Sequence, residues 1–529
     1  MDKIKCLFDK SLTNDDIFMI GATVDTGFEW QAIDEHREKI DGVSAEAIKE
    51  RGRIYFNIKW DQYEKVQEMR SIDNVFIVAD VQTVAFHGTD KKVDLELFKD
   101  AVHKHMNLNK CLDIWKRVTC FMGKLYPTLE EYNSAKEQAP VTKNESETTK
   151  KSKIIGESDT INRSETVKES ETIKESETIE ESETINGSET VKESETIKES
   201  ETIEEPETTK ESDITKESEI TKESETVKKS ETTKESGVIK ESENTKESVT
   251  TKGRKRGVDP SESKEDDILR YRVTCERFGE HKFESTDVAY VIGGELQTKY
   301  HWVVDLSKYH LEIICKLTEQ QLVTLLRVTH KSKHRRNIVS FGPTTLRSTI
   351  CYNLIRLANP KPGDIIIDPM CGSGSIPIEA ALAFSHLCIL CGDNNSKALE
   401  RTKFNINGSA TEARINPVQW VALNLPLKDS FVDIIVTDMP FGKRSGKRSN
   451  NERLYKQFLL ELGRVVKQSS GRLVLLTHDK RSFNQAYKAA GDLFILMRAV
   501  SVKIGGLQVI AYVLKRTNVH YTRFKLRHY

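Results

Sequence analysis

Long apolar stretches are missing from this 529-residue chain. No run of about 18 apolar residues occurs, so no membrane span is expected. The first residues, Met1–Cys6, are followed by Asn14, Asp15 and Asp16, where a secretory signal would place its apolar core. Nine cysteines without such a signal favour reduced thiols and an intracellular protein. We therefore expect a cytoplasmic protein, with access to the nucleus left open.

Signatures of metal and dinucleotide binding are also scarce. Cys388-Ile-Leu-Cys391 is the sole C-x-x-C. Neither a second pair nor a histidine cluster accompanies it, whereas a structural zinc site needs four ligands, so we expect no metal site. The motifs G-x-G-x-x-G and G-x-x-x-x-G-K-[ST] are absent as well. Their absence disfavours dinucleotides and nucleoside triphosphates as ligands.

Aromatic residues are absent from a long repetitive segment. From Ser164 to Gly253 the chain repeats hexads such as Ser-Glu-Thr-Ile-Lys-Glu, each with one or two aliphatic residues at most. Such a segment cannot bury enough apolar surface to offset the entropy lost on ordering. We therefore predict a disordered linker over residues 127–262. Its basic end, Lys252-Gly-Arg-Lys-Arg256, fits a nuclear signal, an RNA-contacting patch or merely a charged linker end.

The segments on either side of this linker have the mixed pattern of small α+β modules. Residues 1–125 alternate short apolar strands with helices, and one strand opens with Arg51 and Arg53. Residues 265–335 contain a strand with Arg272, and the basic run Lys331–Arg336 leads out of this segment. Two interpretations stay open for these basic strand ends, namely exposure to solvent and contact with phosphates.

Residues 338–529 alternate strands with helices, which predicts a doubly wound parallel sheet of the α/β class. Gly505-Gly506 marks the turn of a hairpin that adds an antiparallel strand at the end. The parallel strands are expected at 365–367, 387–391, 417–422, 431–437 and 471–477.

Polar residues follow three of these strands, at the edge where doubly wound sheets bind ligands. Asp368 ends the first strand and precedes a tight loop with Gly372 and Gly374. Asp393-Asn394 ends the second, and a carboxylate about 20 residues after a glycine loop can accept both ribose hydroxyls of a nucleoside. Asp438-Met-Pro-Phe441 follows the fourth. Together these strand ends predict a nucleoside site with a reactive loop beside it.

These motifs resemble a known family. Asp368-Pro-Met-Cys-Gly-Ser-Gly374 is similar to the first motif of class I S-adenosylmethionine-dependent methyltransferases. Asp438-Met-Pro-Phe441 is similar to the [D/N]-P-P-[F/Y] motif of members that methylate planar amino groups. Further segments narrow the resemblance to THUMP-containing tRNA guanosine N2-methyltransferases. They are Gly21–Glu29, Arg51–Phe56, His334–Asn337, Phe341–Thr349 and Val436–Arg444.

The resemblance implies a domain order and a reaction. It implies an N-terminal ferredoxin-like module at 1–125, a THUMP RNA-binding domain at 265–335 and a Rossmann-like methyltransferase domain at 338–529. S-adenosylmethionine is the implied cofactor, and N2 of a tRNA guanosine at position 6 of the acceptor stem is the implied methyl acceptor. The family also implies a small zinc-binding activator subunit that docks on the catalytic domain.

The implied site has three groups of residues. A carboxylate at Asp438 and a carbonyl at Met439 or Pro440 accept the two N–H bonds of the guanine amine, while Phe441 offers a face for the extruded base. The residues implied to bind the cofactor are Asp368, Met370, Cys371, Gly372, Gly374, Asp393, Asn394 and Asn424. RNA contacts are expected at Arg51, Arg53, Arg272, Arg335, Arg336, Lys443 and Arg444.

The chain departs from the family pattern at the adenine end of the pocket. Relatives usually carry an acid where Val421 stands, and that acid accepts a hydrogen bond from the cofactor's adenine amine. Either Asn424 replaces it, or cofactor affinity is reduced. Two other functions are therefore kept in view: methylation of another RNA or of a protein glutamine, and tRNA binding without catalysis.

Overall fold

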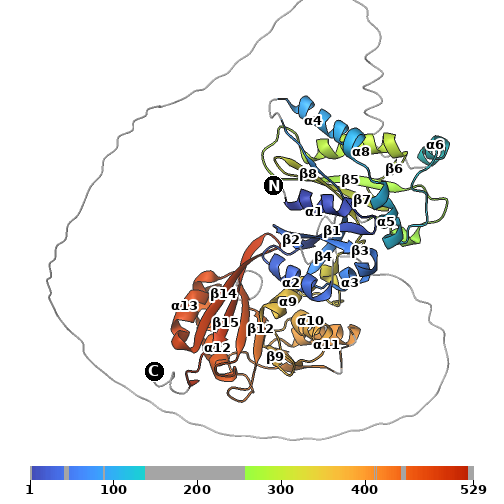
Figure 1. The fold of residues 1–529 in the computed structure, drawn as a ribbon. Helices are drawn as coiled ribbons and strands as arrows, with labels where there is room; N and C mark the ends of the chain where they lie inside the picture. The colour runs from blue at the N-terminus through green and yellow to red at the C-terminus, as the bar shows by residue number, and fades with distance from the viewer. Residues whose placement is uncertain are drawn as a thin grey trace, which may run out of the picture. The chain divides into compact units, whose positions relative to one another are not determined.

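The computed structural model describes residues 3–40, 47–86, 90–137, 257–409, 411–412, 414–441 and 448–521 (Figure 1). The hexad repeats lie outside the described residues. Both ends of the stretch 127–262 carry structure, with helix α6 at Leu129–Glu137 and a 3₁₀ turn at Pro260–Glu262. The sequence interpretation missed this helix because its composition is as polar as the repeats. Within the described part of the chain, no helix combines the length and apolar character needed to cross a bilayer.

The two α+β modules share one eight-stranded sheet, in the order β2-β3-β1-β4-β8-β7-β5-β6. β4 pairs antiparallel with β8, placing Ile77 opposite Leu326, so the pairing joins segments on either side of the predicted linker. The strands are β1 (Ile17–Val24), β2 (Ala47–Glu50), β3 (Arg53–Lys59), β4 (Ile72–Thr83), β5 (Arg270–Arg277), β6 (Val303–Val304), β7 (Leu311–Leu317) and β8 (Gln321–Arg327).

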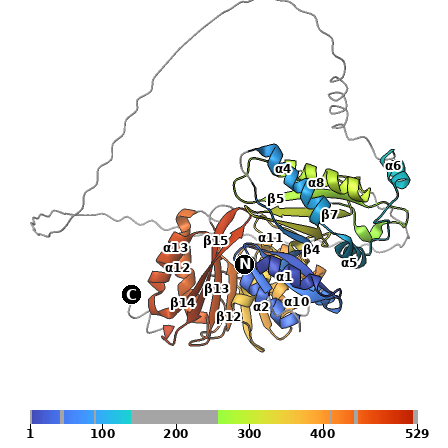
Figure 2. The ribbon, with the colours of Figure 1, turned by 45° about the horizontal axis from the view of Figure 1, so that its top comes forward.

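Helices cover both faces of this sheet because its strands alternate two sets of buried side chains. One face packs against Leu7 and Phe8 of α1 (Lys3–Leu12), a helix that the sequence interpretation missed. The other face bears α4 and α8, which lie side by side in both views (Figures 1 and 2). The helices on that face and around it are α2 (Glu29–Lys39), α3 (Tyr63–Glu68), α4 (Lys91–Asp100), α5 (Asn109–Thr119) and α8 (Ser285–Tyr300).

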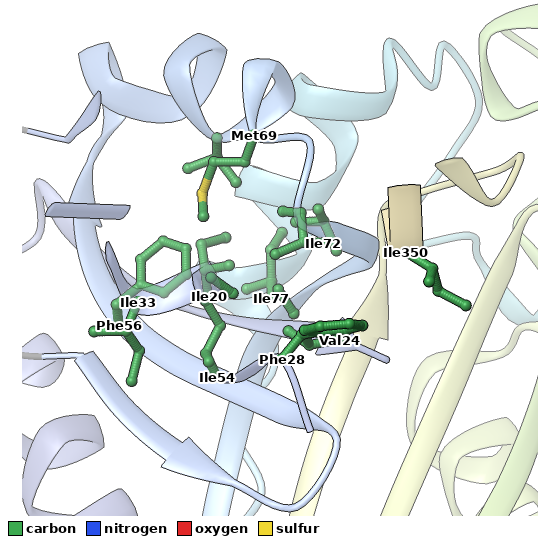
Figure 3. Close-up of a cluster of buried hydrophobic side chains, with 14 of the residues drawn as sticks. Ile20, Val24, Phe28, Ile33, Ile54, Phe56, Met69, Ile72, Ile77 and Ile350 are labelled. Carbon is green, nitrogen blue, oxygen red and sulfur yellow. The ribbon is translucent and has the colours of Figure 1, made fainter. Parts of the chain in front are cut away.

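The core of the N-terminal module shows how the sequence produces this packing. Ile20, Val24, Ile54 and Phe56 alternate along β1 and β3, and they belong to one buried cluster with Ile33 of α2 (Figure 3). Ile350 of α9 belongs to the same continuous cluster of buried residues (Figure 3). The module therefore packs against the beginning of the catalytic domain.

The C-terminal domain has a seven-stranded sheet in the order β11-β10-β9-β12-β13-β15-β14. All neighbours from β11 to β13 are parallel, and β15 pairs antiparallel with β13 and with β14. This confirms the predicted doubly wound sheet with a terminal hairpin. The strands are β9 (Ile365–Asp368), β10 (Cys388–Asp393), β11 (Ile415–Gln419), β12 (Ile434–Asp438), β13 (Arg472–Thr477), β14 (Phe494–Ile504) and β15 (Leu507–Arg516).

Apolar residues on alternate sides of the central strands bury both faces of this sheet. Ile366 and Val436 face one layer of helices, and Ile367 and Ile435 face the other. In the second layer, α12 and α13 lie side by side over β13 and β15 (Figure 2). The helices are α9 (Ser348–Leu357), α10 (Ser375–Ala383), α11 (Ser396–Gly408), α12 (Arg448–Val465) and α13 (Lys480–Ala490).

Two element predictions differ from the structure in this domain. β11 ends at Gln419 rather than at residue 422, because the next side chain, Trp420, turns back and donates from Nε1 to the Pro369 carbonyl at 3.0 Å. α13 was not predicted, since its apolar residues Phe483, Ala486 and Ala490 stand among polar and charged ones.

Candidate active site

The predicted strand ends meet at the topological switch point of the C-terminal sheet. β9 and β12 are neighbours there (Figure 1), although the chain visits β10 and β11 between them. Chain reversal at this point opens a crevice at the carboxyl ends of the strands, where α/β proteins bind their ligands. Asp368 ends β9 and Asp438 ends β12, so both carboxyl groups lie at this crevice.

Asp368 is buried and anchors the start of the glycine loop. Its Oδ1 accepts a hydrogen bond from Thr437 Oγ1 at 2.8 Å and another from the Met370 backbone N–H at 3.2 Å. Burial raises the pKa of Asp368 to about 7, against the lowering effect of these two bonds. A bound cation, such as the ammonium group of a methionine moiety, would favour the ionised form.

The glycine loop fits tightly against α11. Gly374 has φ +83°, and a Cβ there would lie 2.9 Å from Thr402 Cγ2. The Thr402 hydroxyl donates to the Gly372 carbonyl at 2.9 Å. Cys371 is buried beneath the loop, and its thiol pKa is raised by a hydrogen bond with Cys391 and by burial. A neutral thiol at this position is consistent with a packing role.

Asp393 connects the end of β10 to the glycine loop. One carboxylate oxygen accepts from the Gly372 N–H at 3.0 Å, and the other accepts from the Asn395 N–H at 2.9 Å. Each oxygen keeps a second lone pair, which is the arrangement needed to accept two ribose hydroxyls. Asn394 is exposed beside it, and its carbonyl accepts from the Gln419 side chain at 3.1 Å.

Trp420 and Gly392 pack together at the end of the crevice where the resemblance predicts the adenine. A Cβ on Gly392 would lie 2.3 Å from the Val418 carbonyl oxygen and 2.5 Å from the Trp420 ring, so only glycine fits between them. Val421 is 49% exposed. Asn424 is also exposed, and its backbone N–H donates to the Val421 carbonyl at 3.0 Å. The turn thus brings the Asn424 position beside Val421, and the role of Asn424 toward adenine stays a prediction.

The strand-end residues fit S-adenosylmethionine. A cationic end would meet Asp368 and ribose hydroxyls would meet Asp393, and no atom of the described residues beyond its chain neighbours lies within 4 Å of the place where a Cβ on Gly372 would stand. The three carboxyl groups come from three adjacent strand ends. Among the described residues, none of Asp368, Asp393 and Asp438 forms an ion pair with a cationic side chain.

Asp438 has the most unusual environment in the crevice. Its Oδ1 is shielded from solvent and has no hydrogen-bond partner among the described residues. Burial, and then the neighbouring Asp368, raise the pKa of Asp438 to about 8. A buried carboxylate oxygen without a donor is costly, so its retention points to an external donor.

The loop after Asp438 is fixed from behind by a tyrosine that the sequence interpretation missed. Tyr455 of α12 is buried, and its hydroxyl donates to the Pro440 carbonyl at 2.6 Å. The same hydroxyl oxygen lies 2.7 Å from Thr477 Oγ1 at the end of β13. The Pro440 carbonyl is thus engaged inside the protein, which favours the Met439 carbonyl as the second amine acceptor. No local pattern marks Tyr455, because its contacts come from other elements.

Replacing Tyr455 by phenylalanine tests this positioning role. We expect kcat to fall by about tenfold or more, because small displacements of an acceptor loop are costly in catalysis. The dissociation constant for S-adenosylmethionine, measured by calorimetry, should not change. Tyr487→Phe is the matched control, since the Tyr487 hydroxyl lies 3.3 Å from the Phe494 carbonyl, on a helix of the same layer away from the crevice. Equal losses in both variants would contradict the assignment.

A second missed contact lies above the glycine loop. The Thr345 hydroxyl lies 2.6 Å from Ser373 Oγ and accepts from the Gly342 N–H at 2.7 Å. Thr345 belongs to the segment Phe341–Thr349, which is one of the segments that carry the family resemblance. No role was predicted for this segment. Through Thr345, the segment contacts the glycine loop at Ser373.

Several arginines expected to contact RNA form ion pairs inside the protein. Arg53 pairs with Glu276 at 2.7 Å, Arg272 with Glu312 at 2.8 Å, and Arg336 with Glu379 at 3.1 Å. RNA contact at these three positions would have to compete with these pairs. Arg51 is exposed, and its role stays a prediction. The side chain of Arg335, and Lys443 and Arg444 entirely, lie outside the described residues.

Cys388 and Cys391 stand on opposite sides of β10, one exposed and one buried. Among the described residues, no three His, Cys, Asp or Glu side chains gather in a group able to hold a metal ion.

Comparison with known proteins identifies the family of this chain. Residues 335–510 match the family described as RMKL-like, methyltransferase domain. The chain is 36% identical over 512 residues to the bovine tRNA (guanine(6)-N(2))-methyltransferase THUMP3, covering 94% of this chain and 88% of the relative. It is 31% identical over 213 residues to the human U6 snRNA (guanine-N(2))-methyltransferase THUMPD2, covering 40% of this chain and 41% of the relative.

A solved structure extends the similarity to the fold. The crystal structure of TrmN from Thermus thermophilus superposes with a TM-score of 0.55 at 16% identity, covering 94% of this chain and 99% of that one. At this identity the likeness concerns the fold alone. The extent of the match to the THUMP3 relatives confirms the resemblance inferred from the motifs: the chain belongs to the THUMP3 family of S-adenosylmethionine-dependent tRNA (guanine-N2-)-methyltransferases.

Proposed function

We propose that this protein methylates N2 of the guanosine at position 6 in the acceptor stem of tRNA. The observation that carries the proposal is the buried Oδ1 of Asp438, which lacks a donor among the described residues and stands at the switch point beside the cofactor strand. An exocyclic amine supplies the missing donor. Position 6 is taken from the names of the relatives.

The acceptor loop provides what a guanine amine needs. The lone pair of this nitrogen is delocalised into the ring, so the amine is a poor nucleophile. Asp438 Oδ1 and the Met439 carbonyl can each accept one N–H, which holds the nitrogen with its lone pair toward the cofactor crevice. The raised pKa of Asp438 also suits it to take the proton that the nitrogen releases. Phe441 is half-buried next to these groups and offers a stacking face.

The cofactor site complements this loop. When bound, S-adenosylmethionine supplies an electrophilic methyl group on a sulfonium centre. Asp368 would hold its ammonium group, Asp393 its ribose, and Trp420 with Asn424 its adenine. Asp368 is buried and Asp438 Oδ1 is shielded from solvent, and electrostatic contacts are stronger where little water reaches them.

A tRNA substrate is favoured over a small nuclear RNA by the extent of the two similarities. The match to the tRNA enzymes covers 94% of this chain, including the modules before the catalytic domain. The match to the U6 snRNA enzymes covers only 40%. Because the modules before the catalytic domain are the expected RNA-holding part, similarity across them supports the tRNA assignment.

We also propose the zinc-binding activator as a partner and the cytoplasm as the location. In support, β11 is a terminal strand of the catalytic sheet, with Val418 42% exposed, and terminal strands can accept a further strand from a partner. The basic run Lys252–Arg256 leaves nuclear access as a secondary proposal.

Mass analysis of tRNA nucleosides tests the proposed function. Cells without this protein should lose N2-methylguanosine at position 6, and re-expression of the wild-type chain should restore it. Re-expression of Asp438→Ala should not. An unchanged level of N2-methylguanosine at that position in the deletion strain would contradict the proposal.

A further inference from the structure

A histidine outside the predicted site stands beside the acceptor loop. His478 directly follows β13, the neighbour of β12. Asp438 pairs with Leu476 in the sheet, and the Met439 N–H continues the ladder to the Leu476 carbonyl at 2.9 Å. The two chains therefore leave the sheet together, and the rings of Phe441 and His478 lie with their centroids 6.3 Å apart at an angle of 50°.

The β14–β15 hairpin fixes which nitrogen of this ring carries the proton. His478 Nδ1 lies 2.8 Å from the Gln508 carbonyl oxygen. A carbonyl only accepts, so Nδ1 must donate, and the neutral ring keeps its lone pair on Nε2. Among the described residues, Nε2 of His478 has no hydrogen-bond partner. The acceptor loop therefore has a further hydrogen-bond acceptor at its side.

Guanine has a hydrogen-bond donor that His478 Nε2 can accept. Guanine presents two adjacent donors on its Watson–Crick edge, the N2 amine and N1–H, whereas adenine has an acceptor at N1. Asp438 and the Met439 carbonyl account for the amine only. A site that hydrogen-bonds N1–H rejects bases without it, because its own polar group would be left unpaired.

We infer that His478 Nε2 accepts the N1–H of the target guanine, and that His478 thereby selects guanine as the base to be methylated. The inference rests on the proposed function and adds the residue that reads the base. In this arrangement Phe441 stacks on the base, Asp438 and Met439 hold its amine, and His478 contacts the atom next to that amine.

A pair of tRNA substrates tests this hydrogen bond, and because they differ at the 6-position of the base as well as at N1, the part of the preference that the His478 variants remove is its measure. One carries guanosine at position 6, and the other carries 2,6-diaminopurine riboside, which keeps the 2-amino group but has an acceptor at N1. We expect the wild-type protein to prefer guanosine by about tenfold or more in kcat/KM for methylation of the 2-amino group. His478→Phe keeps a ring beside Phe441 and removes the acceptor, so this preference should fall close to one. His478→Gln places a carbonyl oxygen near the former Nε2 and should retain most of it.

His386→Phe is the matched control. His386 also contacts a phenylalanine ring, Phe384, at 6.3 Å, but it precedes β10 at the opposite edge of the sheet. The His386→Phe variant should prefer guanosine over 2,6-diaminopurine riboside as strongly as the wild type does. All variants should bind S-adenosylmethionine with the affinity of the wild type. If His478→Phe does not bind the cofactor, His478→Asn, which is too short to reach the Nε2 position, takes its place. An undiminished preference for guanosine in the Phe or Asn variant would overturn the inference. Absence of guanosine methylation by the wild-type protein would instead overturn the proposed function.

Discussion

Asp438→Ala is expected to lower kcat for tRNA methylation by about 10³-fold or more, because it removes both a positioned acceptor and the base that takes the amine proton. Asp438→Asn keeps one oxygen acceptor without the charge, so we expect an intermediate loss of about 10²-fold. Binding of S-adenosylmethionine and of tRNA should change little in either variant. Single-turnover kinetics will measure the rates, and the affinities for cofactor and tRNA are measured separately. We expect the rate to fall from the wild type to the asparagine variant and further to the alanine variant. Turnover by the alanine variant near the wild-type rate would contradict the role of Asp438.

The same carboxyl group makes stability depend on pH. Its pKa is about 8 in the folded protein against an ordinary value of 3.8, so the folded state binds this proton more tightly than the unfolded state. The stabilisation from the bound proton is complete below about pH 4 and is lost as pH rises toward 8. Asp438→Asn has no such dependence. Thermal unfolding should therefore find the asparagine variant more stable than the wild type at pH 8, with the difference shrinking as the pH is lowered.

The outline of this site was predictable because it depends on local patterns. Asp368, Asp393 and Asp438 each follow a short apolar strand, and parallel strands bring their carboxyl ends to one edge. The residues that position the acceptor loop or stand beside it were not predictable. Tyr455 and His478 become functional only through the register of β12 and β13, which alternating apolar residues do not encode.

The roles of the basic residues could not be predicted from the sequence. Arg53, Arg272 and Arg336 stand in clusters that suggest phosphate contacts, yet each meets a glutamate from another element. For Arg53 the partner lies 223 residues away along the chain. The sequence shows the charge but not the partner, so it cannot separate an RNA contact from an internal ion pair. The shared eight-stranded sheet was equally hidden, since the β4–β8 pairing spans the predicted linker.

Glu379→Ala is expected to lower the free energy of unfolding by about 3 kcal/mol, a typical cost of leaving buried charges without their partner. Glu379 of α10 is only 1% exposed. Its carboxylate accepts from Arg70 at 2.9 Å, from Arg336 at 3.1 and 3.2 Å and from Asn337 at 2.8 Å. Arg70 belongs to the N-terminal module, whereas Arg336 and Asn337 precede the catalytic domain. One carboxylate therefore holds both of these segments against the helix that follows the glycine loop.

Urea unfolding of the full chain measures this cost, and Asp9→Ala serves as the control. Asp9 pairs with Lys5 at 3.0 Å on the exposed side of α1, and such a surface pair contributes about 0.5 kcal/mol or less. A loss in Glu379→Ala no larger than in the control would show that the buried pairs contribute nothing. Changing Glu379, Arg70 and Arg336 together to methionine should recover much of the loss, because well-packed apolar residues can replace a buried ion cluster. Recovery of stability with reduced methylation would show that the charges at this junction serve the alignment of the modules more than their stability.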